Sequence, residues 1–334
     1  MKQYKSLAEY LDEAIKDFEV VNFGMKSGFK VCEGKPQFGN YLNNDAWDDF
    51  YNNMQKNNPI AFKRYDEGSG SEMTPYEHMG NQYPPKMASF GSSSRMIYNL
   101  VTNEKIGNFL FEEKLSTTVG GTANLDGFIQ KDNTYIFVEA KCREPYSSKS
   151  NAVRDVYGDL YAEITELTKL KCECTPFIRK VKNKKTGKIQ MVKMLNVKFK
   201  CDNNTINHFD MKQMICHLLA VGTAVLTNHY DEMKNANNED IKLHFIYLIY
   251  NPQELVFKDA KSAEKIMKIY NDIFSFCNGN ENQFFKDLFK VILGFLQTKK
   301  NLGTKKDILK IVDNFTFHFC SQEDFKKKCE SLLQ

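Results

Sequence analysis

Two stretches in the middle of the chain are mainly apolar runs of strand length, each interrupted by an acidic residue. They cover residues 123–130 and 134–142, and both are rich in the aromatic and β-branched residues that favour strands. The polar segment Lys131-Asp132-Asn133 separates them and is typical of a tight turn. The pattern therefore predicts a β-hairpin that carries an acidic residue inside each of its strands.

The alternating direction of side chains along a strand also predicts which of them meet on this hairpin. Glu139 and Lys141 share a face of the second strand, because successive residues point to opposite sides. A turn centred on Asp132 and Asn133 pairs position 126 with position 139, and directly paired residues have Cβ atoms roughly 5 Å apart on one face. We therefore expect Asp126, Glu139 and Lys141 to converge on one spot, unless a bulge shifts the register.

Two carboxylates at this separation repel each other unless a cation lies between them. Mg²⁺ suits such a place, because it prefers oxygen ligands and commonly binds through one or two carboxylates. Lys141 could hold a water molecule or offset a developing charge beside the metal. The alternative is a surface hairpin with ordinary salt bridges, but a glutamate between Val138 and Ala140 in an apolar strand needs a partner.

An aspartate followed by Glu-x-Lys on a hairpin resembles the catalytic core of the PD-(D/E)XK nuclease superfamily. The longer phrases SSSRMIYNL, FEEKLSTTVGGTANLDGFI and YIFVEAKCREPY also look like a bacterial family of restriction-endonuclease-like proteins. The sequence departs from the superfamily motif at Leu125, which stands where a proline precedes the aspartate. The resemblance implies an α/β fold with a restriction-endonuclease-like core: a mixed central β-sheet flanked by helices, with a helical C-terminal part.

The same resemblance implies Mg²⁺- or Mn²⁺-dependent hydrolysis of DNA phosphodiester bonds, with a type II restriction endonuclease as one form. It makes Asp126 and Glu139 metal ligands together with the Ala140 carbonyl, and Lys141 the residue that positions the attacking water. DNA is the expected partner, and a homodimer is one expected assembly. Two alternatives stay open: a nucleic-acid-binding protein of this fold that does not cleave, and a nuclease for RNA or for branched or damaged DNA.

Two further residues are candidates for the site. A strand expected at 109–115 places Glu113 among apolar side chains, where it either binds the metal or positions water, or else pairs with a nearby Lys or Arg. A helix expected at 211–227, with Asp210 as its N-terminal cap, carries Gln213 and His217 one turn apart on one face. In the superfamily a helix after the Glu-x-Lys strand often packs beside the active site, so Gln213 is a candidate for a supporting role there. The alternative is that both are ordinary polar residues of a packed helix.

A second hairpin, expected at 177–200, contains no acidic residue and many basic ones. It is either a ribbon that contacts nucleic-acid phosphates or a solvated surface element. The candidate contact residues are Arg179, Lys180, Lys182, Lys184, Lys185 and Lys188.

Composition adds bounds to this picture. Net charge is only +4, so a nucleic-acid surface requires an uneven distribution of charge. The nine cysteines form no regular framework, and the N-terminal segment lacks the apolar core of a signal peptide. No run approaches the roughly 20 apolar residues that span a bilayer. We therefore expect a cytoplasmic protein with reduced thiols and no membrane partner.

The chain divides into three regions on these patterns. Residues 1–90 form a helical and irregular N-terminal region, 91–257 the nuclease-like core with the basic hairpin as an insertion, and 258–334 a helical C-terminal region. A serine-capped helix is expected after Ser92, and the apolar run 242–250 is expected to be a central strand. Other helices are expected at 5–19, 151–171, 260–276, 281–298 and 321–333.

Overall fold

The computed structural model describes most of the chain. The described residues are 5–31, 37–68, 72–78, 80–147, 151–182, 187–201, 204–231, 233, 241–279, 283–303 and 306–334.

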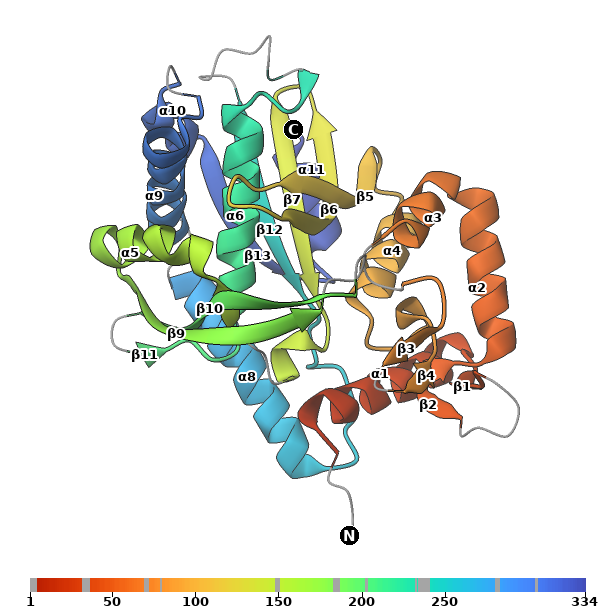
Figure 1. Ribbon diagram of the computed structural model, residues 1–334. Helices are drawn as coiled ribbons and strands as arrows, with labels where there is room; N and C mark the ends of the chain where they lie inside the picture. The colour runs from red at the N-terminus through yellow and green to blue at the C-terminus, as the bar shows by residue number, and fades with distance from the viewer. Residues whose placement is uncertain are drawn as a thin grey trace.

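The protein has a mixed five-stranded central sheet with helices on both faces (Figure 1). The strands lie in the order β13-β12-β7-β6-β5; β12 is parallel to β7 and β13, and the other pairs are antiparallel. Their bounds are β5 (Phe109–Ser116), β6 (Thr122–Lys131), β7 (Thr134–Lys141), β12 (Lys242–Ile249) and β13 (Phe315–Ser321). The first four strands are those that the sequence pattern predicted.

Strand β13 corrects the prediction of an entirely helical C-terminal region. Its residues alternate apolar and polar side chains, and it pairs with β12 from Leu243–Phe315 to Ile249–Ser321. The C-terminal region therefore completes the central sheet. The other elements of this region are α8 (Ala260–Gly279), α9 (Gln283–Lys300), α10 (Ile308–Asp313) and α11 (Phe325–Leu332).

Aromatic contacts identify the helices on each face of the sheet. On one face, Phe285 of α9 stacks on Phe317 with ring centres 3.7 Å apart, and α9 packs against α6 (Met211–Leu226). On the opposite face, Tyr98 of α4 (Ser93–Asn103) contacts Phe111 with ring centres 5.6 Å apart. Helix α6 begins with the predicted Asp210 cap, whose Oδ1 accepts the Gln213 N–H at 3.1 Å, and α4 begins with the predicted Ser92 cap.

The N-terminal region is more regular than its composition predicted. Its first helix has a capping box in which Ser6 and Glu9 bond each other's backbone N–H groups. Trp47 is buried and packs against Phe50 and Tyr51. The elements are α1 (Leu7–Phe23), β1 (Ser27–Phe29), β2 (Phe38–Leu42), α2 (Asn44–Asn57), α3 (Pro59–Asp66), β3 (Tyr76–His78) and β4 (Asn81–Tyr83).

A second sheet contains the long ribbon of β9 (Leu170–Lys182) and β10 (Ile189–Cys201). In the view of Figure 1 the ribbon runs across the front of the molecule from α5 (Gly158–Leu167). Strand β11 (Asn204–Thr205) pairs with β10 at the base of the ribbon, and β8 (Ala152–Arg154) pairs with residues 194–196 in the middle of β10. The predicted hairpin is therefore confirmed, but the helix expected over 151–171 is wrong at both ends, where β8 and β9 lie. Among the described residues, no helix combines the length and apolar character needed to cross a membrane.

Candidate metal and catalytic site

The β6–β7 hairpin has the register that its turn predicts. The paired residues run from Lys131 and Thr134 to Gly127 and Val138, so the next opposing positions are 126 and 139. The left-handed backbone of Asp132, with φ 51°, closes the two-residue turn. A bulge therefore does not displace the two acidic positions from each other.

The backbone pairing of β6 with β7 ends at Gly127 and Val138, next to Asp126. Asp126 Oδ2 accepts the Ala140 N–H at 2.7 Å, in the place where a continued ladder would pair Ala140 with Leu125. The Lys141 carbonyl accepts the Tyr250 N–H of the chain beyond β12, so the adjacent residue Ala140 turns its backbone groups toward β6. The Ala140 carbonyl consequently lies on the side of β7 that faces Asp126. This is the carbonyl that the resemblance implies to be a metal ligand.

Glu139 and Lys141 form a buried ion pair on the same strand. Lys141 Nζ contacts Glu139 Oε1, and the two residues are only 6% and 2% exposed. Burial opposes the charge of Lys141, but Glu139, Glu144 and Asp126 outweigh it and raise the lysine pKa well above its ordinary value. Lys141 is therefore a cation held among carboxylates.

The carboxylates at this place are electrostatically crowded. Burial and the Glu139 charge raise the pKa of Asp126 well above its ordinary value, against the effect of Lys141 and of the Ala140 N–H. Burial also raises the pKa of Glu139, although Lys141 opposes that shift. The single lysine charge does not offset both acids, so the site favours a further positive charge.

Glu112 is a third acid that the sequence analysis missed. The ladder pairs Phe111 with Gly127 and Glu113 with Leu125, which places Glu112 opposite Asp126. Burial and the Asp126 charge raise the pKa of Glu112 to about 8. Its backbone is left-handed, with φ 52°, which is an uncommon conformation for a residue other than glycine. The β5–β6 register would have identified Glu112 in place of Glu113.

Glu113 forms the ion pair that was one of its two expected roles. Its Oε2 contacts Arg64 Nη1 at 2.9 Å, and its Oε1 accepts the Tyr230 hydroxyl at 3.1 Å. Both carboxylate oxygens are thus engaged by neighbouring side chains. These contacts attach the edge strand β5 to α3 and to the segment after α6.

Helix α6 brings His217, one turn beyond Gln213, to Glu139. His217 Nδ1 lies 3.3 Å from Glu139 Oε2, and both residues are buried. The two atoms lack the alignment of a hydrogen bond, and neither has another partner among the described residues. Burial and the nearby Lys141 lower the pKa of His217 to about 3, so its ring is neutral. Gln213 is half-buried, and its backbone N–H is bound to the helix cap.

The loop after β7 is fixed to the N-terminal helices. Glu144 accepts the Cys142 N–H and the Ser93 hydroxyl, each at 2.9 Å, while Arg143 contacts Asp12 of α1 at 2.6 Å. The Ser93–Glu144 hydrogen bond brings the segments SSSRMIYNL and YIFVEAKCREPY together in space. Ser93, Arg143 and Glu144 also line a polar hollow of about 270 Å³ beside this loop.

The side chains present are compatible with a hard divalent cation. The available donors are the oxygens of Asp126, Glu139 and the Ala140 carbonyl, and Glu139 Oε2 is a buried oxygen without a hydrogen-bond donor. Mg²⁺ needs only one or two carboxylates when water or phosphate supplies its other ligands. Within the part of the chain that the structure describes, no group of three or more His, Cys, Asp or Glu side chains could hold a metal. A metal at this site would therefore use the Ala140 carbonyl, water or phosphate as ligands besides the two carboxylates.

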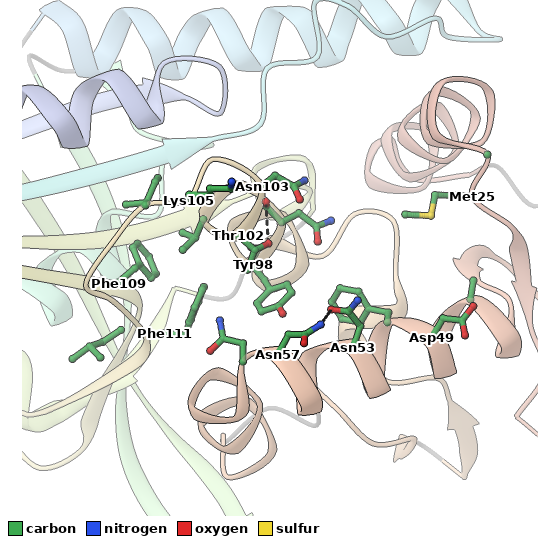
Figure 2. Close-up of a pocket in the computed structure, with 18 of the residues that line it drawn as sticks. Met25, Asp49, Asn53, Asn57, Tyr98, Thr102, Asn103, Lys105, Phe109 and Phe111 are labelled. Carbon is green, nitrogen blue, oxygen red and sulfur yellow. Dashed lines mark hydrogen bonds between the residues drawn. The ribbon is translucent and has the colours of Figure 1, made fainter.

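A larger hollow of about 890 Å³ lies on the other side of β5, between α2 and α4 (Figure 2). Figure 2 shows Asn53 and Asn57 of α2 near Tyr98 of α4, with Phe111 beside them. Its lining includes neither Asp126 nor Glu139. The hollow is therefore separate from the acidic site.

The basic residues of the second hairpin lie on the β9–β10 ribbon. Arg179, Lys180 and Lys188 are exposed. Lys184 and Lys185 lie outside the described residues, as does the side chain of Lys182. Near the base, Lys200 is paired with Glu173 at 2.5 Å.

Comparisons of the chain with models of protein families, with curated proteins and with solved structures give no match.

Proposed function

We propose that the protein is a metal-dependent endonuclease that hydrolyses DNA phosphodiester bonds, with a restriction-endonuclease-like core. The observation that carries the proposal is the opposition of Asp126 and Glu139 across a hairpin that opens at the Ala140 N–H, with Lys141 paired to Glu139. This geometry supports the resemblance of the sequence to the Asp and Glu-x-Lys motif of the PD-(D/E)XK superfamily. A type II restriction endonuclease is one form of this function.

Asp126, Glu139 and the Ala140 carbonyl would hold the cation, which is Mg²⁺ or Mn²⁺. Bound there, the cation would polarise a phosphate oxygen and lower the pKa of a coordinated water. A cation bound there would offset the burial of both carboxylates, which raises their pKa values, and the Glu139 charge, which raises that of Asp126 further.

Lys141 would orient the attacking water and offset negative charge on the phosphate in the transition state. Its ammonium is already charged and held in place by Glu139, so little reorganisation is required. His217, which is neutral, would limit the rotation of the Glu139 carboxylate from the opposite side. Gln213 would have at most a supporting role, one turn before His217 on α6.

The test is digestion of long phage DNA, supercoiled plasmid and structured RNA in Mg²⁺ or EDTA, followed by sequencing of the ends. The control is the Glu139→Gln variant purified in the same way. Cleavage of DNA by the wild type in Mg²⁺ alone, and not by the variant, supports the proposal. Cleavage of RNA alone assigns an RNA nuclease, and no cleavage of any substrate favours a nucleic-acid-binding protein that does not cut.

A further inference from the structure

The pairing of β9 with β10 defines two faces of the ribbon. Directly paired residues share a face, and the register pairs Lys180 with Met191 and Ile178 with Lys193. Ile189 lies two residues from Met191 and therefore on the same face. We call Ile178, Lys180, Ile189, Met191 and Lys193 the outer face. Each of its two directly paired positions, 180 with 191 and 178 with 193, places a lysine beside a large apolar side chain.

The outer face is open to solvent, while the opposite face is partly covered. Ile178, Ile189 and Met191 are 64%, 69% and 63% exposed. On the opposite face, Phe177 is 37% exposed and its partner Met194 only 9%. The outer face therefore combines neighbouring large apolar side chains with cations, and no layer of the described residues covers it.

An exposed apolar surface of this kind typically marks an interaction site. The positive charge of the ribbon limits the kind of partner that can bind there. Residues 170–201 include Glu173 as the only acid beside many lysines and an arginine. Two ribbons of this charge would repel each other, which disfavours a second copy of the chain. A polyanion that also offers apolar groups has the complementary chemistry.

We propose that the outer face lies in the major groove of duplex DNA; this inference rests on the proposed function. A two-stranded β-ribbon fits the major groove, where thymine presents its C5 methyl group. Lys180 and Lys193 contact phosphates at the groove edges, and Ile178, Ile189 and Met191 pack against thymine methyl groups. The A-form major groove of RNA is deep and too narrow for side chains to read, so the ribbon selects DNA over RNA.

Binding is measured by fluorescence anisotropy in EDTA, with full-length protein carrying Glu139→Gln so that cleavage does not interfere. The probes are a DNA duplex, the same duplex with deoxyuridine in place of thymidine, and an RNA duplex. We expect the thymidine duplex to bind several-fold more tightly than the deoxyuridine duplex, and the RNA duplex most weakly. Equal affinity for all three duplexes would overturn the proposal.

Matched substitutions separate the two faces of the ribbon. Lys180→Gln with Lys193→Gln should weaken binding about tenfold or more at 0.1 M salt and reduce the salt slope by about two. Arg179→Gln, on the opposite face, should weaken binding less than Lys180→Gln alone. Ile189→Ser with Met191→Ser should abolish the thymidine preference and leave the salt slope unchanged. All these sites are exposed, and circular dichroism checks that each variant folds.

Other results would assign a different occupant. If the outer-face variants lose binding to phosphatidylserine vesicles but not to DNA, the face contacts a membrane. If they change the sedimentation of the protein without changing DNA affinity, the face contacts a second copy. If the protein binds DNA with these properties but never cleaves it, the nuclease proposal is refuted and the major-groove proposal stands. If the protein cleaves DNA and the outer-face substitutions have no effect, the major-groove proposal is refuted and the nuclease proposal stands.

Discussion

Glu112 and Glu113 are neighbours on β5, yet their carboxylates have opposite electrostatic surroundings. Glu113 is held by Arg64 at 2.9 Å, whereas Glu112 lies opposite Asp126 and has its pKa raised to about 8 by burial and by that acid. The adjacent pair therefore provides an internal control for the effect of negative charge at the candidate site.

The first prediction concerns the stability of the metal-free protein. From pH 4.5 to 8 the unfolded chain releases the Glu112 proton while the folded protein retains it, so this acid makes stability fall as the pH rises. Glu112→Gln should remove that dependence and raise the Tm at pH 8. Glu113→Gln should instead lower the Tm by about 2–4 °C, because it weakens the Arg64 pair. Thermal unfolding in EDTA at pH 5 and pH 8 measures both, and a parallel change in the two variants would contradict the assignment.

The second prediction concerns the cation. Asp126→Asn and Glu139→Gln should each weaken Mn²⁺ binding about tenfold or more, because each removes a charged oxygen ligand. Glu113→Gln should leave the affinity unchanged, since its carboxylate belongs to Arg64 and Tyr230. Titration calorimetry gives the affinities, and Mn²⁺ should raise the Tm of the wild type most. If both site variants fold and bind Mn²⁺ as tightly as the wild type, the assignment of the metal site is wrong.

The third prediction separates His217 from Gln213. His217→Leu should weaken Mn²⁺ affinity and cleavage about tenfold, because the Glu139 carboxylate loses its neighbour, whereas Gln213→Ala should change them little. His217→Asn should restore part of the loss, since its amide offers a donor near the position of Nδ1. Equal effects of His217→Leu and His217→Asn would indicate that the ring serves only for packing.

A fourth prediction follows from the protonation state of His217. Its pKa is lowered to about 3, so the folded protein keeps it neutral while the unfolded chain takes up a proton below pH 6.5. Its contribution to stability should therefore be present above pH 6.5 and decline as the pH falls. Imidazole NMR signals of His217 should not titrate between pH 5 and 8; a midpoint near 6.5 would contradict the buried, neutral ring.

The hairpin and its acidic pair were predictable because local rules determine them. A two-residue turn and period-2 alternation suffice to place position 126 opposite position 139. The helix caps at Ser92 and Asp210 were also evident from sequence, because each cap acts on its own first turn.

The rest depended on contacts between distant segments. Sequence analysis considered Glu113 and not Glu112, because it did not use the β5–β6 register, and it could not identify Arg64, 49 residues earlier in the chain, as the partner of Glu113. The proximity of His217 to Glu139 required the packing of α6 on the sheet. Strand β13 was overlooked although its residues alternate apolar and polar side chains, because helical segments flank it on both sides.

The most direct test of the proposed nuclease is single-turnover cleavage by Lys141→Met, measured beside DNA affinity in Ca²⁺. Lys141 acts on the chemical step in this account, so the variant should lose about 10²–10³-fold in cleavage rate while its DNA affinity stays within a few fold. Lys141→Arg should also fail, because a planar guanidinium cannot replace a compact ammonium in a buried pair. Thermal unfolding confirms that each variant is folded. Cleavage by Lys141→Met at the wild-type rate would contradict the catalytic assignment.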